Sequence, residues 1–310
     1  MQPRETVLRT LALADAFGWA LTAFEVWQYA IREGGEKIQP GFEDVRVSET
    51  LTALDALVVD GALVEQHGHY AFAGQEALIE ERLWRTQLIE QKRRKARRWA
   101  QRIIRLPYVE GVFAYGSLAT GHTKKESDLD VFVVLRDNRI FLGRLVTTLL
   151  LEMFGVRRTA TKITDQVCLN HFVVASALEF PEEYRSPFSA WLWARMFPLA
   201  ADKKLAERFY RANVWVTDYF PNLERSQRVE RVKGSKTLLA LPLYPLLRFG
   251  DAVEWLLGRY QLKRIAQHPL THAGTGRVVA GERMMIFHPA LPEEEVMERF
   301  RARCENLHIQ

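Results

Sequence analysis

The sequence predicts an α+β fold, because segments with helical spacing lie on both sides of a short stretch of strands. Apolar residues recur every three or four positions in residues 6–17 and through most of residues 179–310, as on the buried face of a helix. Between these segments, residues 112–115 and 129–135 are apolar runs with the length and composition of buried strands. Both patterns fit a sheet in the middle of the chain with helices around it.

The first 75 residues have the order of elements found in a winged helix. Residues 6–17 and 21–31 have helical spacing, and Ser48 is a suitable N-cap for a third helix. Two short strands then flank a turn at residues 67–69, which supplies the wing. We therefore expect a winged-helix-like domain over residues 1–75.

The charge of this N-terminal segment disfavours DNA binding. Residues 1–79 contain five Lys and Arg against twelve Asp and Glu, and the third helix carries Glu49, Asp55 and Asp60 with only Arg46 near its start. Binding to duplex DNA draws much of its affinity from Lys and Arg on phosphates. A protein contact or a role in positioning a substrate is the favoured interpretation.

Residues 76–106 are expected to form one long connector helix with a basic surface. Residues 80–105 contain ten Lys and Arg against three Glu. The helix either packs on the central domain as a solvated connector or offers a basic track to the phosphates of RNA or DNA. Its expected apolar stripe comprises Trp84, Leu88, Ala96, Trp99 and Ile103.

Two carboxylates and a Gly-Ser turn make the central stretch the candidate functional site. Asp128 and Asp130 are separated by one apolar residue in a strand, so their side chains point to the same face. Paired carboxylates at a strand end suit Mg²⁺, which prefers oxygen ligands and retains waters or substrate phosphates. Gly116 and Ser117 follow the preceding strand in a tight turn whose backbone N–H groups suit a phosphate. This pattern predicts a metal-assisted site for a nucleoside triphosphate.

These residues resemble a known family. The run GSLATG at residues 116–121 and the run SDLDVFVV at residues 127–134 are similar to the signature of the DNA polymerase β-like nucleotidyltransferase superfamily, and most of all to its minimal-nucleotidyltransferase branch. The resemblance implies a small mixed β-sheet nucleotidyltransferase core, expected over residues 107–178, with flanking helices.

The resemblance also implies a reaction and roles for the motif residues. An acceptor hydroxyl would attack the α-phosphorus of an NTP, such as ATP, and pyrophosphate would leave. Asp128 and Asp130 would be the catalytic ligands of one or two Mg²⁺ ions, and Gly116 and Ser117 would bind the nucleotide's terminal phosphates. Further charge could be neutralised by Lys124, Lys125, Arg157 and Arg158, of which the two lysines fit a solvated polar loop.

The third carboxylate that the superfamily pattern implies is not evident. The strand expected at residues 166–174 offers Asn170 and His171 as its polar residues, and the nearest acid, Asp165, precedes it. Asn170 could occupy the third position as a weaker neutral ligand, Asp165 could substitute for it, or the protein could bind nucleotide without turnover. We favour Asn170, and we interpret His171 as a hydrogen-bonded core histidine.

The C-terminal segment, residues 179–310, is expected to form a helical domain interrupted by prolines. A basic run between Arg225 and Lys236 is interpreted as a solvated loop, with a role in holding an acidic acceptor or the nucleotide as the alternative. The apolar run at residues 237–247 is too short to span a bilayer. With no signal pattern and two distant cysteines, a cytoplasmic protein without a membrane segment is expected.

Three functions therefore remain open. The first is an active nucleotidyltransferase whose acceptor is an RNA end, a protein side chain or a small molecule. The second is a catalytically degenerate nucleotide-binding or regulatory protein of the same fold. The third is a winged-helix DNA-binding regulator, which the acidic balance of the N-terminal segment disfavours.

Overall fold

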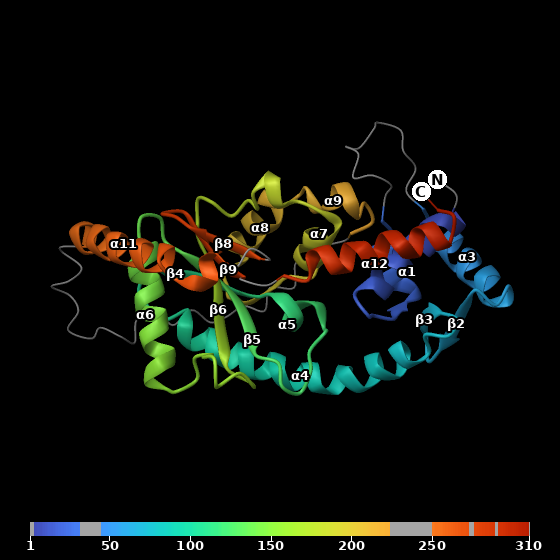
Figure 1. Ribbon diagram of the computed structural model, residues 1–310, viewed down its shortest axis with the longest axis horizontal. Helices are drawn as coiled ribbons and strands as arrows, with labels where there is room; N and C mark the ends of the chain where they lie inside the picture. The colour runs from blue at the N-terminus through green and yellow to red at the C-terminus, as the bar shows by residue number, and fades with distance from the viewer. Residues whose placement is uncertain (1–2, 32–44, 224–249, 273–275, 289–290, 310) are drawn as a thin grey trace.

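The computed structural model describes residues 3–31, 45–223, 250–272, 276–288 and 291–309. Within these residues the chain forms a three-stranded sheet near the N-terminus and a six-stranded sheet at the centre, with helices packed around both (Figure 1). The predicted α+β class is confirmed. None of the described helices combines the length and apolarity needed to cross a bilayer.

The N-terminal part has the expected order of helices and hairpin. Its sheet is antiparallel with the strand order β1-β3-β2. The turn between the last two strands needs positive φ, which His67 and Gly68 adopt at 53° and 74°. Whether this part is a winged helix stays a prediction. Its elements are α1 (Pro3–Ala16), β1 (Leu21–Thr22), α2 (Ala23–Gln28), α3 (Val47–Val59), β2 (Leu63–Gln66) and β3 (His69–Phe72).

Two helix starts differ from the sequence-based expectation. The segment from residue 21 begins with two strand residues, and Thr22 and Glu25 then form a capping box at the start of α2. The residue at the N-cap of α3 is Arg46 and not Ser48, because Glu49 accepts a hydrogen bond from the Arg46 backbone N–H. The third helix therefore begins earlier than its most suitable capping side chain indicates.

The long connector helix, α4 (Ala77–Ile103), is confirmed, but its buried stripe is not the expected one. Ala96 and Ile103 are buried as predicted, whereas Trp84 is 57% exposed. Helical spacing places Ile89 on the buried face together with two cations, Arg85 and Lys92, which other parts of the chain hold by hydrogen bonds. Charged side chains can take core positions when their donors are satisfied.

The central sheet has the strand order β7-β4-β5-β6-β9-β8. Only β5 and β6 are parallel among these neighbours, and α6 forms the crossover between them. The elements from the fourth strand to the sixth are β4 (Val109–Ala114), α5 (Gly116–Thr120), β5 (Leu129–Leu135), α6 (Ile140–Met153) and β6 (Val167–Val174). Asn138 has φ 56°, and the next residue, Arg139, is the N-cap of α6.

Each face of this sheet has its own apolar core. Val112 and Val131 face a cluster that includes Ala96 of α4 and Leu151 of α6. The opposite face, with Phe132, packs on side chains of helices from the C-terminal part and joins the core of the N-terminal part. Alternation along β5 places Asp130 on the same side as Phe132. The acidic motif thus opens toward the side where all three parts of the chain meet.

The segment from residue 179 onward is not only helical. It also supplies three strands of the central sheet, so the sheet does not end at the expected boundary after residue 178. These strands are short, and Pro198 lies in an edge strand, where a missing N–H is tolerated. The described elements are α7 (Pro187–Ala194), β7 (Phe197–Ala201), α8 (Lys203–Ala212), α9 (Val216–Tyr219), α11 (Gly250–Ala266), β8 (Arg277–Ala280), β9 (Met284–His288) and α12 (Glu293–Asn306), with short 3₁₀ turns at Glu182–Tyr184 and Pro269–His272.

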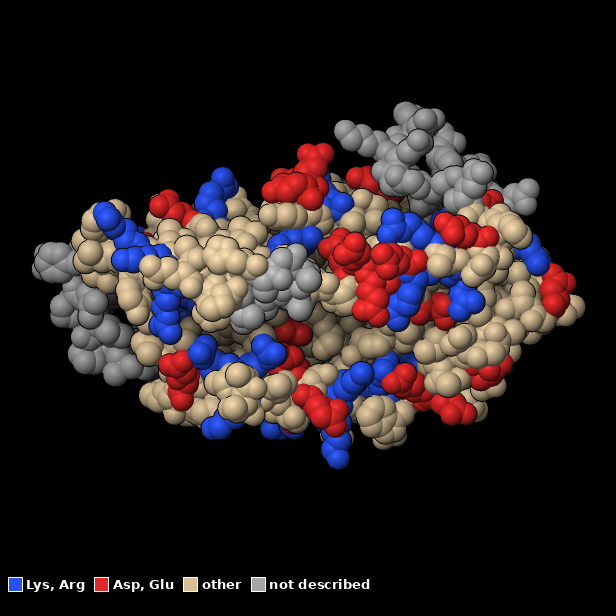
Figure 2. Space-filling view, viewed as in Figure 1, with Lys and Arg blue, Asp and Glu red and all other residues tan. Residues whose placement is uncertain are grey.

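The surface is hollowed between the upper body, which carries α12, and the lower edge formed by α4 (Figure 2). Acidic side chains cluster over the start of α12, where Glu293, Glu294 and Glu295 occupy the first turn. The basic run at residues 225–236 and the apolar run at residues 237–247 lie outside the described residues.

Candidate functional site

The Gly-Ser turn lies directly against the acid pair. β4 ends at Ala114, and α5 begins at Gly116 with a positive φ of 54°. A Cβ at this position would lie 2.6 Å from Oδ2 of Asp130. Only glycine allows both the left-handed backbone and this close approach. The two halves of the motif, eleven to fourteen positions apart in the chain, are therefore brought together in the fold.

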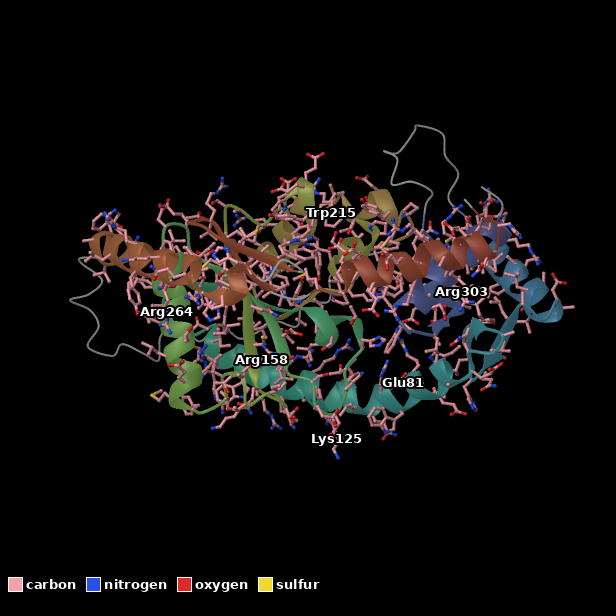
Figure 3. The ribbon with its side chains drawn as sticks, in the orientation of Figure 1. Glu81, Lys125, Arg158, Trp215, Arg264 and Arg303 are labelled. Atoms are coloured by element: carbon pink, nitrogen blue, oxygen red, sulfur yellow. The ribbon has the colours of Figure 1, made fainter. Side chains whose placement is uncertain are left out.

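The two carboxylates have different partners. Asp128 immediately precedes β5, and its Oδ2 forms an ion pair with Nε of Arg158 at 2.7 Å. Asp130 lies within β5, and its Oδ1 accepts a hydrogen bond from Nδ2 of Asn170 at 2.7 Å. Figure 3 places Arg158 beside β5 and β6, whereas Lys125 points away from the body of the molecule. Of the four cations suggested by the sequence, Arg158 is the one that contacts the acid pair.

A β-bulge in β6 explains how Asn170 reaches Asp130. Along the parallel pairing of β5 and β6, Val131 lies opposite Leu169, and the next residue, Phe132, lies opposite His171. Asn170 is therefore the extra residue of β6. Bulges re-aim side chains and are frequent beside active sites. Simple alternation would place Asn170 and His171 on opposite faces, but here Asn170 contacts Asp130 while the His171 ring lies 4.5 Å from that of Phe132.

Cys168 is a site residue that the sequence did not reveal. It pairs with Asp130 across β5 and β6, and its sulfur lies within 4.8 Å of a carboxylate oxygen of both Asp128 and Asp130. Its position two residues before Asn170 in one strand is the signal that could have identified it. Burial, followed by the neighbouring carboxylates, raises the pKa of the Cys168 thiol. A neutral thiol is a poor ligand, so the two acids remain the candidate metal-binding groups.

The electrostatics at Asp130 fit a bound cation. Burial and the charge of Asp128 raise the pKa of Asp130 to about 7, although the hydrogen bond from Asn170 lowers it. A divalent cation between the two carboxylates would remove the repulsion that raises this pKa. The side-chain oxygen of Asn170 is buried without a hydrogen-bond partner. Two carboxylates and a free amide oxygen are the hard donors that Mg²⁺ takes.

Asp165, the alternative third acid, is engaged elsewhere. Its carboxylate binds Lys92 at 3.1 Å and also forms an ion pair with Lys95, both on α4. Burial would raise the pKa of Asp165, but the hydrogen bonds and charges of these lysines lower it. Of the two candidates for the third position, Asn170 is the one that touches the acid pair.

A cavity of about 360 Å³ opens beside the motif. Gly116, Ser117, Asp130 and Asn170 form one wall. The other walls come from segments far away in the sequence, and include Phe17, Trp19, Trp191, His288 and Arg299. No local pattern marks these residues, because only the fold brings them to the motif.

His171 is a core residue, as expected, but it has no hydrogen bond. It is fully buried, and neither ring nitrogen has a partner. Its ring lies among those of Tyr115, Phe132, Trp193 and His288. Burial lowers its pKa well below the ordinary value, so the imidazole is neutral at pH 7.

Comparison with known families agrees with this geometry. Residues 94–180, from the second half of α4 to just beyond β6, match the family model described as a nucleotidyltransferase domain. Neither the curated proteins nor the solved structures compared with this chain include a match. The matched segment contains the Gly-Ser turn, the acid pair and Asn170. Residues 94–180 are therefore a nucleotidyltransferase domain of the DNA polymerase β-like superfamily.

Proposed function

We propose that the protein is a Mg²⁺-dependent nucleotidyltransferase that moves an NMP group from an NTP to a hydroxyl acceptor and releases pyrophosphate. The observation that carries this proposal is the contact between the two motif halves, where the Gly116 backbone lies against the Asp130 carboxylate at the wall of a cavity. Within that wall, a metal held by the acids and a phosphate held by the turn would be neighbours.

Asp128 and Asp130 are the proposed metal ligands, with Asn170 as a neutral third ligand. Mg²⁺ at such a site polarises the phosphates and offsets their charge. Ser117 and the backbone at Gly116 bind phosphate oxygens of the NTP. Arg158 neutralises further phosphate charge, since its guanidinium already lies at the acid pair.

The amide of Asn170 limits the mechanism. The acceptor oxygen forms the new bond to the α-phosphorus as the bond to pyrophosphate breaks, and the acceptor's proton passes to solvent water. An amide is not basic in the physiological pH range, so Asn170 can hold a ligand in place but cannot take that proton. A slower reaction than one assisted by a third carboxylate follows.

The N-terminal part is proposed to position the substrate. Phe17 follows α1 and Trp19 precedes β1, and both side chains line the cavity beside Asp130. Flat aromatic side chains at a nucleotide cavity suit stacking on a base. This supports substrate positioning by the N-terminal part over DNA binding.

A catalytically degenerate nucleotide-binding or regulatory protein is the second candidate, because Asn170 stands at the proposed third position. To separate the two, the purified protein is incubated with Mg²⁺, each α-labelled NTP and fractions of RNA, protein and small molecules. Label transferred to any fraction supports the enzyme, whereas NTP binding without transfer supports the second candidate.

The matched variants for this experiment are Asp128→Asn with Asp130→Asn, and Glu126→Gln as the control. Glu126 is an exposed acid in the same loop. The double variant is expected to lose transfer and the control to retain it. Transfer that survives the double change would exclude this site as the centre of the reaction.

A further inference from the structure

A second cavity lies on the other side of Trp19 and Thr120, which border both cavities. Its volume is about 500 Å³. Its walls come from α2, from the inner face of α4, from the end of α5 and from the segment that follows α7. We call it the arginine cavity, because five arginines line it against two glutamates: Arg82, Arg85, Arg93, Arg97 and Arg195, with Glu25 and Glu90.

Arg195 is the most constrained of these cations. It is only 9% exposed, and its guanidinium carbon lies 3.7 Å from the ring centroid of Tyr29 and 3.3 Å from that of Trp191. Nη1 donates to the Trp191 carbonyl at 3.4 Å, whereas Nη2 is buried without a hydrogen-bond partner. Burial lowers the pKa of Arg195 to about 10, so it is still charged at pH 7. A buried charge with an unused N–H donor lowers the stability of the fold unless a ligand accepts the hydrogen bond and offsets the charge.

Arg85 repeats this arrangement on α4. It is 3% exposed, and its two terminal nitrogens bind His122 and Glu81. Its Nε is buried without a partner. Two buried guanidinium groups on the walls of one cavity thus each have an unused N–H donor.

The glutamates of the cavity do not satisfy these donors. Glu25 pairs with Arg82 at 2.8 Å, and Glu90 pairs with Arg93 at 3.4 Å. Arg93 also donates to the carbonyls of Leu118 and Ala119 at the end of α5. Across the described lining residues, positive charge therefore exceeds negative charge.

We propose that the arginine cavity binds a phosphate-bearing molecule of nucleotide size. This would be a second ligand, beside the cavity at Asp130, which we call the reaction cavity because the proposed transfer would take place there. Phosphate oxygens accept several hydrogen bonds at once, which is what clustered guanidinium groups recognise. The volume lies within the range of small-molecule sites, and the rings of Trp19, Tyr29 and Phe197 add apolar wall. The ligand can be an acceptor or an effector, and its binding does not depend on the proposed transfer reaction.

The test uses the full chain and inorganic pyrophosphate in calorimetric titrations with EDTA present, so that metal-dependent binding at the acid pair does not contribute. Binding by the wild-type protein and by the Asp128→Asn, Asp130→Asn double variant is expected to be equal. Arg195→Gln and Arg85→Gln should each weaken binding about tenfold or more, because each removes a charged donor. Absence of binding by the wild type would overturn the proposal.

Arg98→Gln is the matched control, because Arg98 lies on the exposed side of the same helix and does not line the cavity. An equal loss in all three variants would show surface electrostatics only and would also overturn the proposal. Circular dichroism checks folding, and Arg195→Lys replaces Arg195→Gln if the latter unfolds; it retains the charge but not the donor geometry, and weaker binding is again expected.

Competition then identifies the source of the phosphate. Displacement of pyrophosphate by ADP but not by a short RNA identifies a free nucleotide. Displacement by a 5′-phosphorylated RNA but not by its 5′-hydroxyl twin identifies a nucleic acid end. If none of these phosphate esters displaces pyrophosphate, the proposal of a ligand of nucleotide size is wrong.

Discussion

The two cavities beside α5 differ in charge and in how the sequence encodes them. The reaction cavity takes its chemistry from residues of one superfamily motif, with Asp130, Gly116 and Ser117 at its wall. The arginine cavity gathers its cations from α4 and from Arg195, almost one hundred positions further along the chain. A cavity that has acids can hold a cation, and one that has arginines can hold an anion. The comparison indicates that the proposed transfer site and the proposed second-ligand site consist of different residues, so each can be tested separately.

The largest expected effect is a separation of the two sites by single changes. Asp130→Asn should lower NMP transfer by about a thousandfold or more, since it removes a metal ligand, and should leave pyrophosphate binding in EDTA unchanged. Arg195→Gln should weaken pyrophosphate binding and leave the rate of NMP transfer unchanged. Transfer rates and titrations on both variants measure this. Loss of both properties in Asp130→Asn would show that the cavities form one site.

Gly116→Ala tests the contact between the motif halves. The new Cβ would require a left-handed alanine and would meet the Asp130 carboxylate. We expect a loss of about 1–2 kcal/mol in the free energy of unfolding from the backbone alone, together with strongly reduced transfer. Chemical denaturation and transfer assays are the measurements. The matched control is Gly61→Ala, which also has positive φ but would meet no atom within 4 Å. Equal effects on transfer would contradict the close-contact interpretation.

Asn170→Asp asks whether the third position is a metal site. The new carboxylate would lie beside Asp130, so the metal-free protein should unfold at a lower temperature because of like-charge repulsion. Mg²⁺ should raise the unfolding temperature more in this variant than in the wild type. Thermal unfolding with and without Mg²⁺ measures the difference. An equal Mg²⁺ response would remove Asn170 from the ligand set.

The smallest effect concerns two partly buried histidines, His122 and His288, at the reaction cavity. Burial lowers the pKa of His122 to about 3 and that of His288 to about 4. Each ring is neutral in the folded chain. In the unfolded chain the same histidines take up protons once the pH falls below the ordinary histidine pKa of about 6.5. The folded state therefore loses stability as pH falls from about 7 toward 4. Denaturation at a series of pH values should show this fall, and His122→Gln should reduce it, while His308→Gln at the exposed C-terminal end should not. A stability that is flat over this range would contradict the assignment.

The motif could be predicted from the sequence because its residues lie in one short stretch of strand, turn and strand. Strand length, the turn glycine and alternation were enough to single out Gly116, Ser117, Asp128 and Asp130 as one candidate site. They also singled out Asn170 as the polar residue of the next strand, but not the bulge that places it on Asp130, because a bulge leaves no mark in the apolar pattern.

Other features depended on packing between distant segments. Arg85 and Lys92 read as surface cations, and only their partners on a distant loop explain why the chain buries them. The strands after residue 178 were missed because runs as short as that containing Pro198 resemble helix ends until an edge of a sheet is available.

Lys92 and Arg85 also determine how this domain can be isolated. Nζ of Lys92 binds the carbonyl oxygens of Lys125 and Ser127, and Arg85 binds His122. Hydrogen bonds from one helix, α4, thus hold both ends of the loop that leads into Asp128. The family match begins at residue 94, after both Arg85 and Lys92. A fragment that begins at residue 94 would retain every motif residue but would lose the hydrogen bonds that position the loop before Asp128. A minimal fragment that keeps these contacts must begin upstream of Arg85.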